Sequence, residues 1–135
     1  MPKSFVEIHA RVRPLPTGEP CGLTQDGSAL HLADGSGGRQ FHFQTVLGQA
    51  STQQQCFTAT TRPLVESFVN GYNGAVLAYG QTGAGKSHTM FGPEEASCYD
   101  GERGLCARAI SAAFQLIAQR GLRDRATVGP REDTL

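Results

Sequence analysis

The sequence predicts an α/β fold, and this prediction rests on three observations. Residues 74–79, GAVLAY, form a short apolar run bounded by glycines, which is typical of a fully buried parallel strand. The run leads directly into the glycine-rich stretch GQTGAGKSHTM at residues 80–90, which opens a helical pattern. Segments with strand periodicity precede this unit, and a second amphipathic helical segment follows it.

The N-terminal part of the chain predicts strands. Residues 5–13 alternate between apolar and polar side chains, which predicts a strand with one apolar face. That face is expected to comprise Val6, Ile8, Ala10 and Val12. Residues 21–38 hold two Asp-Gly dipeptides around a short apolar piece, and this pattern predicts a hairpin. Residues 39–48 predict one further strand, with Phe41 and Phe43, and also Val46, facing the core.

A helix is expected in the middle of the chain. Ser51 is a suitable N-cap residue, and Gln54 completes a capping-box pattern with it. Apolar residues then recur at helical spacing as far as Phe68. Pro63 lies inside this pattern, so the helix is predicted to bend or split there. Residues 70–74, NGYNG, are expected to end the helix and turn the chain into the buried strand.

The C-terminal part predicts a short helix, a polar loop and a second helix. The helix that follows the glycine-rich stretch is expected to break near Gly92, and residues 93–103 form the loop. Residues 104–120 gather apolar side chains on one face, which predicts an amphipathic helix. Residues 121–135 show no period and end in charges, so they predict a divergent, disordered tail. Residues 1–120 are therefore expected to form the folded part.

The glycine-rich stretch matches the phosphate-binding pattern G-x-x-x-x-G-K-[ST]. Its glycines permit backbone conformations closed to other residues, so that N–H groups converge on phosphate oxygens next to a helix N-terminus. Lys86 adds a charge for the β- and γ-phosphates, and Ser87 offers a hydroxyl to Mg²⁺, which usually keeps several waters. The predicted nucleotide site comprises Gly80, Gln81, Thr82, Gly83, Ala84, Gly85, Lys86 and Ser87.

The composition of the chain argues against several kinds of binding partner. The 135 residues carry 12 basic and 12 acidic side chains, and this balance gives no sign of nucleic-acid binding. No apolar run approaches the length of a membrane span, and charged residues come too early for a secretory signal. The four cysteines lie 35, 42 and 8 residues apart, without metal-ligand spacing. We therefore expect a cytosolic protein with reduced thiols that binds neither nucleic acid nor membrane.

Three segments together resemble the first part of a kinesin motor domain. They are RVRP at residues 11–14, GYNGAVLAYGQTGAGKSHTMFG at 71–92 and RGLCARAISAAFQLI at 103–117. The resemblance covers residues 5–120, and its central block is far more distinctive than the phosphate-binding pattern alone. It implies a P-loop NTPase fold, here an incomplete kinesin-like sheet with flanking helices. It also implies ATP and Mg²⁺ as cofactors, and a family activity of ATP-driven movement along microtubules of the cytoplasmic cytoskeleton.

The resemblance assigns roles to single residues. Arg11, Arg13 and Pro14 match the family segment that packs against adenine, and a guanidinium plane can stack on a flat ring. His88 matches a residue that also flanks the base, and Ser87 matches the Mg²⁺-coordinating hydroxyl. The sequence departs from the usual family pattern at Gln44, Leu47 and Ala107.

Two motifs of the family do not occur in this sequence. They are the switches N-x-x-S-S-R-S-H and D-L-A-G-S-E, through which the family reads the γ-phosphate. Phosphoryl transfer needs a group that positions the attacking water, and charge that stabilises the transition state. The microtubule-binding elements also come later in the family's chain. We therefore expect the ATP-binding fragment of a motor, with no catalytic residue and no hydrolysis of its own, that reaches microtubules only through a full-length protein.

Two other classes of function stay open at the level of sequence. A non-catalytic nucleotide-binding or regulatory fragment agrees with the missing switches. A small P-loop kinase agrees less well, because such enzymes usually place the phosphate loop after their first strand. Here about half of the chain precedes that loop.

Overall fold

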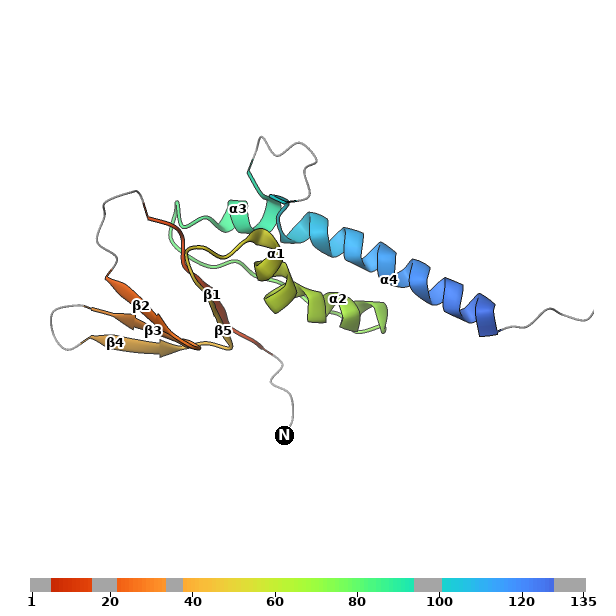
Figure 1. Cartoon of the computed structure of the whole chain (residues 1–135), viewed down its shortest axis with the longest axis horizontal. Coiled ribbons are helices and arrows are strands. Elements are labelled where there is room, and N and C mark those ends of the chain that lie inside the picture. Colours follow the sequence, from red (N-terminus) through yellow and green to blue (C-terminus); the bar gives the residue numbers. More distant parts are fainter. Residues whose placement is uncertain (1–5, 16–21, 34–37, 94–100, 128–135) are drawn as a thin grey trace, which may run out of the picture.

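The computed structural model describes residues 6–15, 22–33, 38–93 and 101–127. Its elements follow one another as β1 (His9–Arg11), β2 (Leu23–Asp26), β3 (Ala29–Leu32), β4 (Arg39–His42), β5 (Thr45–Leu47), α1 (Gln53–Cys56), η1 (Phe57–Thr61), α2 (Arg62–Val69), α3 (Lys86–Phe91) and α4 (Leu105–Thr127). The β2–β3–β4 sheet lies on one side of the β1–β5 pair, and the helices lie on the other side (Figure 1). The fold is thus α/β, with a partial sheet.

The hairpin predicted within residues 21–38 is confirmed. Strands β2 and β3 pair in antiparallel register, with Asp26 opposite Ala29. Gly27 closes the turn between them at φ 54°, a left-handed conformation that glycine adopts without steric cost. Strand β4 then pairs antiparallel with β3 and completes a small three-stranded sheet.

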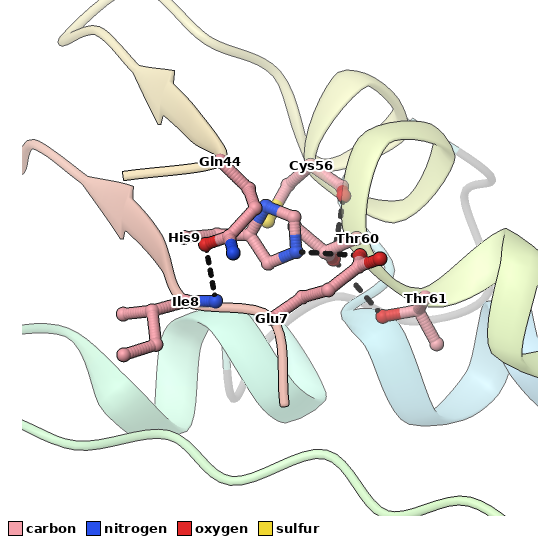
Figure 2. Close-up of polar contacts among 7 residues, drawn as sticks. All are labelled: Glu7, Ile8, His9, Gln44, Cys56, Thr60 and Thr61. Carbon is pink, nitrogen blue, oxygen red and sulfur yellow. Dashed lines mark hydrogen bonds and ion pairs between the residues drawn. The ribbon is translucent and has the colours of Figure 1, made fainter. Parts of the chain in front are cut away.

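The single strand predicted over residues 39–48 is in fact two strands in different sheets. β4 joins the hairpin, whereas β5 pairs in parallel with β1. Gln44 makes this change of sheet, because its N–H donates to Ile8 O over 2.9 Å and its Oε1 accepts from the Ile8 N–H over 2.7 Å (Figure 2). As a result Val46 is buried, while Phe41, expected in the core, is 46% exposed.

The N-terminal strand is shorter than predicted. It was expected over residues 5–13, but only His9–Arg11 pair with β5, in register from His9 opposite Thr45. Val6 and Ile8 of the expected apolar face are 67% and 59% exposed. The physical reason is that β1 has one short neighbour among the described residues, so its ladder extends no further than the backbone bonds of Ile8 and Val12.

The buried strand predicted at residues 74–79 does not form. These residues carry no regular secondary structure, and Leu77 is 92% exposed. A buried parallel strand requires hydrogen-bonding neighbours at its edges and apolar layers over both faces. The described part of the chain supplies no strand that pairs with this segment.

The core lies between β5, the α1–α2 region and the start of α4. Its buried apolar members are Leu47, Cys56, Phe57, Val65 and Leu105. Partly buried alanines of α4, together with Leu116, pack against this cluster. The amphipathic helix predicted for residues 104–120 therefore forms, and its small apolar side chains pack against this core, next to α2. The helix continues beyond residue 120 to Thr127, so the first seven residues of the expected tail, 121–127, are helical and the rest lies outside the described residues.

The helix that begins in the middle of the chain has Thr52 as its N-cap, one residue later than predicted. Thr52 Oγ1 accepts from the Gln55 N–H over 3.1 Å, and Gln55 Oε1 accepts from the Thr52 N–H over 2.8 Å. Ser51 belongs to the preceding turn, because its N–H donates to Gly48 O. The split predicted at Pro63 is confirmed, since a π-helical turn precedes α2 and Pro63 occupies its first turn.

Two glycines let the end of α3 touch the start of α4. Gly104 N–H donates to Phe91 O over 3.2 Å. A Cβ on Gly104 would lie 2.4 Å from Phe91 N, and one on Gly92 would lie 2.6 Å from Glu102 O. Both positions therefore exclude any larger residue. The helix after the glycine-rich stretch ends at Phe91 with Gly92 as its C-cap, which confirms the predicted break.

We predict that Thr52→Ala lowers the free energy of unfolding by about 1 kcal/mol, because it removes one side of the capping box. The matched variant Ser51→Ala should change it by less than about 0.5 kcal/mol, since the Ser51 side chain caps nothing. Urea denaturation followed by circular dichroism measures both values. A larger loss for Ser51→Ala than for Thr52→Ala would contradict the observed cap.

Candidate nucleotide-binding site

The glycine-rich stretch forms a loop that passes into α3 at Lys86. Gly83 and Gly85 have φ values of 78° and 92°, and nothing lies within 4 Å of a Cβ built on either. The glycines are thus required by backbone conformation, and the space beside them is open. The helix expected to follow the glycine-rich stretch begins at Lys86, although residues 74–79, directly before the loop, form no strand.

Backbone carbonyl groups of the loop hold the Lys86 side chain in place. Its Nζ donates to Gly80 O over 2.9 Å and to Gln81 O over 2.8 Å. Ser87 follows in the first turn of α3, where it is exposed. The N–H groups of a first helical turn have no intrahelical acceptor, so they are available to an anion. The loop therefore presents an ammonium, a hydroxyl and backbone donors within a few residues of each other.

Arg13 connects the N-terminal segment to this loop. Its Nη1 donates to Gly83 O, so the chain that follows β1 lies against the middle of the loop. Arg13 and Pro14 are both exposed, and so is His88 in α3. The structure thus brings together the residues predicted at residues 11–14 and 80–88.

Arg11 lies deeper than its neighbour Arg13. Its Nη1 donates to Gln53 Oε1 over 2.9 Å and to Thr89 Oγ1 over 3.0 Å, and its Nη2 donates to Ser51 O over 3.5 Å. These contacts join β1 to the start of α1 and to α3. The guanidinium predicted to stack on a base is therefore engaged with two other segments of the protein, and its contact with adenine stays a prediction.

Gln53 is a site residue that sequence reasoning missed. It is only 2% exposed, and its Nε2 donates to His88 O over 2.6 Å and lies 3.3 Å from His88 Nδ1. The same amide accepts from Arg11 through Oε1. The sequence offers one signal for this role: Gln53 is a polar residue in the first turn of the predicted helix, on the face that the apolar residues of that helix turn toward the core.

A second cluster of polar side chains, which includes Glu7, His9 and Thr60, lies near Cys56 and β1. His9 Nε2 lies 3.6 Å from Glu7 Oε2, and Thr60 Oγ1 donates to Cys56 O over 2.8 Å (Figure 2). His9 Nδ1 is buried and has no hydrogen-bond partner among the described residues. Burial raises the pKa of the Cys56 thiol above its usual value of 9.0, and the nearby Arg11 charge opposes this effect.

No group of three or more His, Cys, Asp or Glu side chains that could hold a metal ion occurs among the described residues. Ser87, the predicted Mg²⁺ ligand, is not one of these four residue types, and it lies in the first turn of α3. Within the same residues, no helix is both long and apolar enough to cross a membrane.

Comparison with known proteins gives one consistent family. The family model described as "Kinesin motor domain" matches residues 21–129, a range that begins after Pro14. Kinesin-like protein kif7 of Danio rerio is 35% identical over 128 residues, which cover 90% of this chain and 9% of that protein. Kinesin-like protein KIF7 of Homo sapiens is 38% identical over 125 residues, with coverage of 88% and 9%. The chain thus spans about a tenth of the length of these relatives.

A solved structure gives the same result for the fold. It is described as "Structure of a fast kinesin: Implications for ATPase mechanism and interactions with microtubules". The match has a TM-score of 0.75 and 33% sequence identity, and it covers 84% of this chain and 33% of that chain.

The burial of Cys56 predicts a loss of stability at alkaline pH. The folded pKa is raised, so above about pH 9 the unfolded thiol ionises while the folded one keeps its proton. Unfolding then releases a proton, and the free energy of unfolding falls by up to about 1.4 kcal/mol per pH unit on this account. Urea titrations from pH 7.5 to pH 10 should show a shallower decline for Cys56→Ala than for the unaltered protein.

Cys106→Ala is the matched control, because it removes a thiol from a partly exposed position on α4. It should leave the alkaline decline unchanged. If the free energy of unfolding falls equally with pH in Cys56→Ala and in the unaltered protein, burial of this thiol has no part in the pH dependence of stability.

Proposed function

This chain belongs to the kinesin motor-domain family, and on that premise we propose that residues 80–87 bind the phosphates of ATP. The observation that carries the proposal is the loop itself: left-handed glycines beside open space, followed at once by Lys86 and the start of α3. A loop of this kind lets backbone N–H groups converge on phosphate oxygens. Lys86, which donates to two loop carbonyls, would turn its ammonium to the β- and γ-phosphates.

Ser87 would hold Mg²⁺ through its hydroxyl. The hydroxyl is exposed in the first turn of α3, next to the loop that would carry the phosphates. Mg²⁺ usually keeps several waters and takes only one or two protein ligands together with substrate phosphates, so a single hydroxyl is a sufficient protein contribution. When bound, the ion neutralises negative charge on the β- and γ-phosphates.

The nucleoside would lie between the segment after β1 and His88. Arg13 reaches the loop at Gly83 O, and Pro14 follows it on the exposed surface. Arg13 can place its guanidinium plane against the base, as Arg guanidinium groups do on flat rings. Arg11 would support this nucleoside site indirectly, because its hydrogen bonds to Gln53 and Thr89 hold α1 and α3 next to β1.

The whole protein of which this chain is a part would couple ATP hydrolysis to movement along microtubules in the cytoplasm. The support is the family, together with the ATPase mechanism and microtubule interactions named for the fast kinesin. The 135 residues alone hold neither S-S-R-S-H nor D-L-A-G-S-E. Affinity shared equally by the ground state and the transition state does not raise the rate of the bound complex. We therefore propose that this segment binds ATP without turning it over.

The second candidate function is a non-catalytic nucleotide-binding or regulatory fragment. It differs from the first in what the segment does by itself, and the absent switches favour it for the isolated chain. Membership of the kinesin family leaves a small P-loop kinase without support.

We predict that Lys86→Ala lowers the affinity for Mg-ATP and Mg-ADP by about tenfold to a hundredfold. A hydrogen bond to a charged group is worth roughly 1.5–3 kcal/mol, which corresponds to that range. Isothermal titration calorimetry measures the effect. Lys3→Ala is the matched control, because Lys3 is the only other lysine in the sequence and it lies far from the loop along the chain. Equal affinities for Lys86→Ala and Lys3→Ala would contradict the phosphate-loop role.

We also predict that the 135-residue chain releases phosphate from ATP only at the background rate, with or without polymerised tubulin. The reason is that Lys86, Ser87 and His88 supply binding contacts but no group that positions the attacking water. A phosphate-release assay with Lys86→Ala as the blank measures this. Turnover that depends on Lys86 and rises with microtubules would show that the segment contains more of the catalytic apparatus than proposed.

A further inference from the structure

The amide of Gln53 has its orientation fixed by its neighbours. Arg11 can only donate hydrogen bonds, and its Nη1 lies 2.9 Å from Gln53 Oε1. The oxygen of the amide must therefore face Arg11. Gln53 is 2% exposed, so an amide turned the other way would leave two buried donors facing each other.

The nitrogen of the same amide consequently faces His88. Its two N–H groups have two neighbours, His88 O at 2.6 Å and His88 Nδ1 at 3.3 Å. A backbone carbonyl only accepts, so one N–H is committed to it. The second N–H lies against Nδ1, which can accept it only when Nδ1 carries no proton of its own.

The neutral imidazole then has its proton on Nε2. A neutral imidazole has one donor and one acceptor nitrogen, and the hydrogen bond made by one nitrogen decides which tautomer is present. His88 is exposed, and its Nδ1 edge is taken by Gln53. The edge that carries the Nε2–H donor is thus the one available to a ligand.

We propose that Gln53 is a positioning residue that holds His88 in the Nε2–H tautomer, and that this N–H donates to an acceptor atom of the bound nucleoside. The chain of contacts runs from Arg11 on β1, through Gln53 on α1, to His88 on α3. The tautomer follows from the protein alone. The contact with the nucleoside rests on the proposed function, because it requires a nucleotide on the adjacent loop.

The tautomer is tested in the full chain by NMR of ¹⁵N-labelled histidine rings. The signals of His88 are identified by their loss in His88→Asn. In the unaltered protein at pH 8, Nδ1 is expected to show the shift of an unprotonated ring nitrogen and Nε2 that of a protonated one. The opposite pattern, or an average of the two, overturns the proposal without recourse to any variant of Gln53.

Gln53→Glu provides the converse test. A carboxylate keeps a partner for Arg11 but can only accept from the ring, so the proton of His88 should move to Nδ1. Gln54→Glu is the matched control on the same helix, since Gln54 is exposed and contacts Thr58 and Arg108 instead. It should leave the ring signals of His88 unchanged. A Gln53→Glu protein that is folded and retains the Nε2–H tautomer would also overturn the proposal.

Calorimetry separates the nucleoside contact from the proposed phosphate site. Gln53→Glu should weaken Mg-ADP by roughly threefold to tenfold more than it weakens Mg-tripolyphosphate, the effect of one hydrogen bond, because the added carboxylate repels both anionic ligands. Equal losses for the two ligands, or none for Mg-ADP, would remove the nucleoside contact. If the unaltered protein binds neither ligand, the proposed function fails and the donor role fails with it, while the ring signals still decide the tautomer.

Discussion

The hydrogen bonds of Arg11 hold together the three segments on which the candidate site depends. They join β1 to Ser51 and Gln53 at the start of α1, 40 and 42 residues away along the chain, and to Thr89 of α3, 78 residues away. Strand β1 has three residues and, in the described part of the chain, one neighbouring strand, so its ladder alone would fix it weakly. The guanidinium offers several donors in one rigid plane, which suits a position where three chain segments must be oriented at once. The position of Arg13 against the glycine-rich loop follows from this arrangement.

The structure also shows which parts of a P-loop fold are local and which are not. The loop and the start of α3 depend on glycine conformations and on bonds that Lys86 makes within six residues, and they form. The segment at residues 74–79 depends on neighbouring strands, and it forms no regular secondary structure, with Leu77 and Tyr79 exposed. Burying it as a strand with open edges would leave its backbone polar groups unpaired.

Most local signals in the sequence predict the structure correctly, and the long-range contacts are not predicted. The Asp-Gly turn at Gly27, the interruption at Pro63 and the loop-to-helix transition at Lys86 each follow from a few neighbouring residues. The N-cap was placed one residue early, because Ser51 and Thr52 are both good caps and only the bond from Ser51 N–H to Gly48 O decides between them. The split of residues 39–48 and the burial of Gln53 arise from Ile8, Arg11 and His88, which are distant in sequence. The hydrophobic periodicity of a segment does not show which residues distant in sequence will contact it.

The contact between Gly92 and Gly104 separates the geometry of the two helices from the polypeptide that connects them. Once Gly104 N–H is bonded to Phe91 O, the ends of the connecting segment are pinned regardless of what it contains. Closing a flexible loop costs entropy only with the logarithm of its length, about 0.6 kcal/mol for each doubling. The free energy of closing this connection therefore depends only weakly on its length. The approach of α3 to α4 depends instead on the two glycines, because a Cβ on Gly104 or Gly92 would lie 2.4 Å or 2.6 Å from a backbone atom of the other segment.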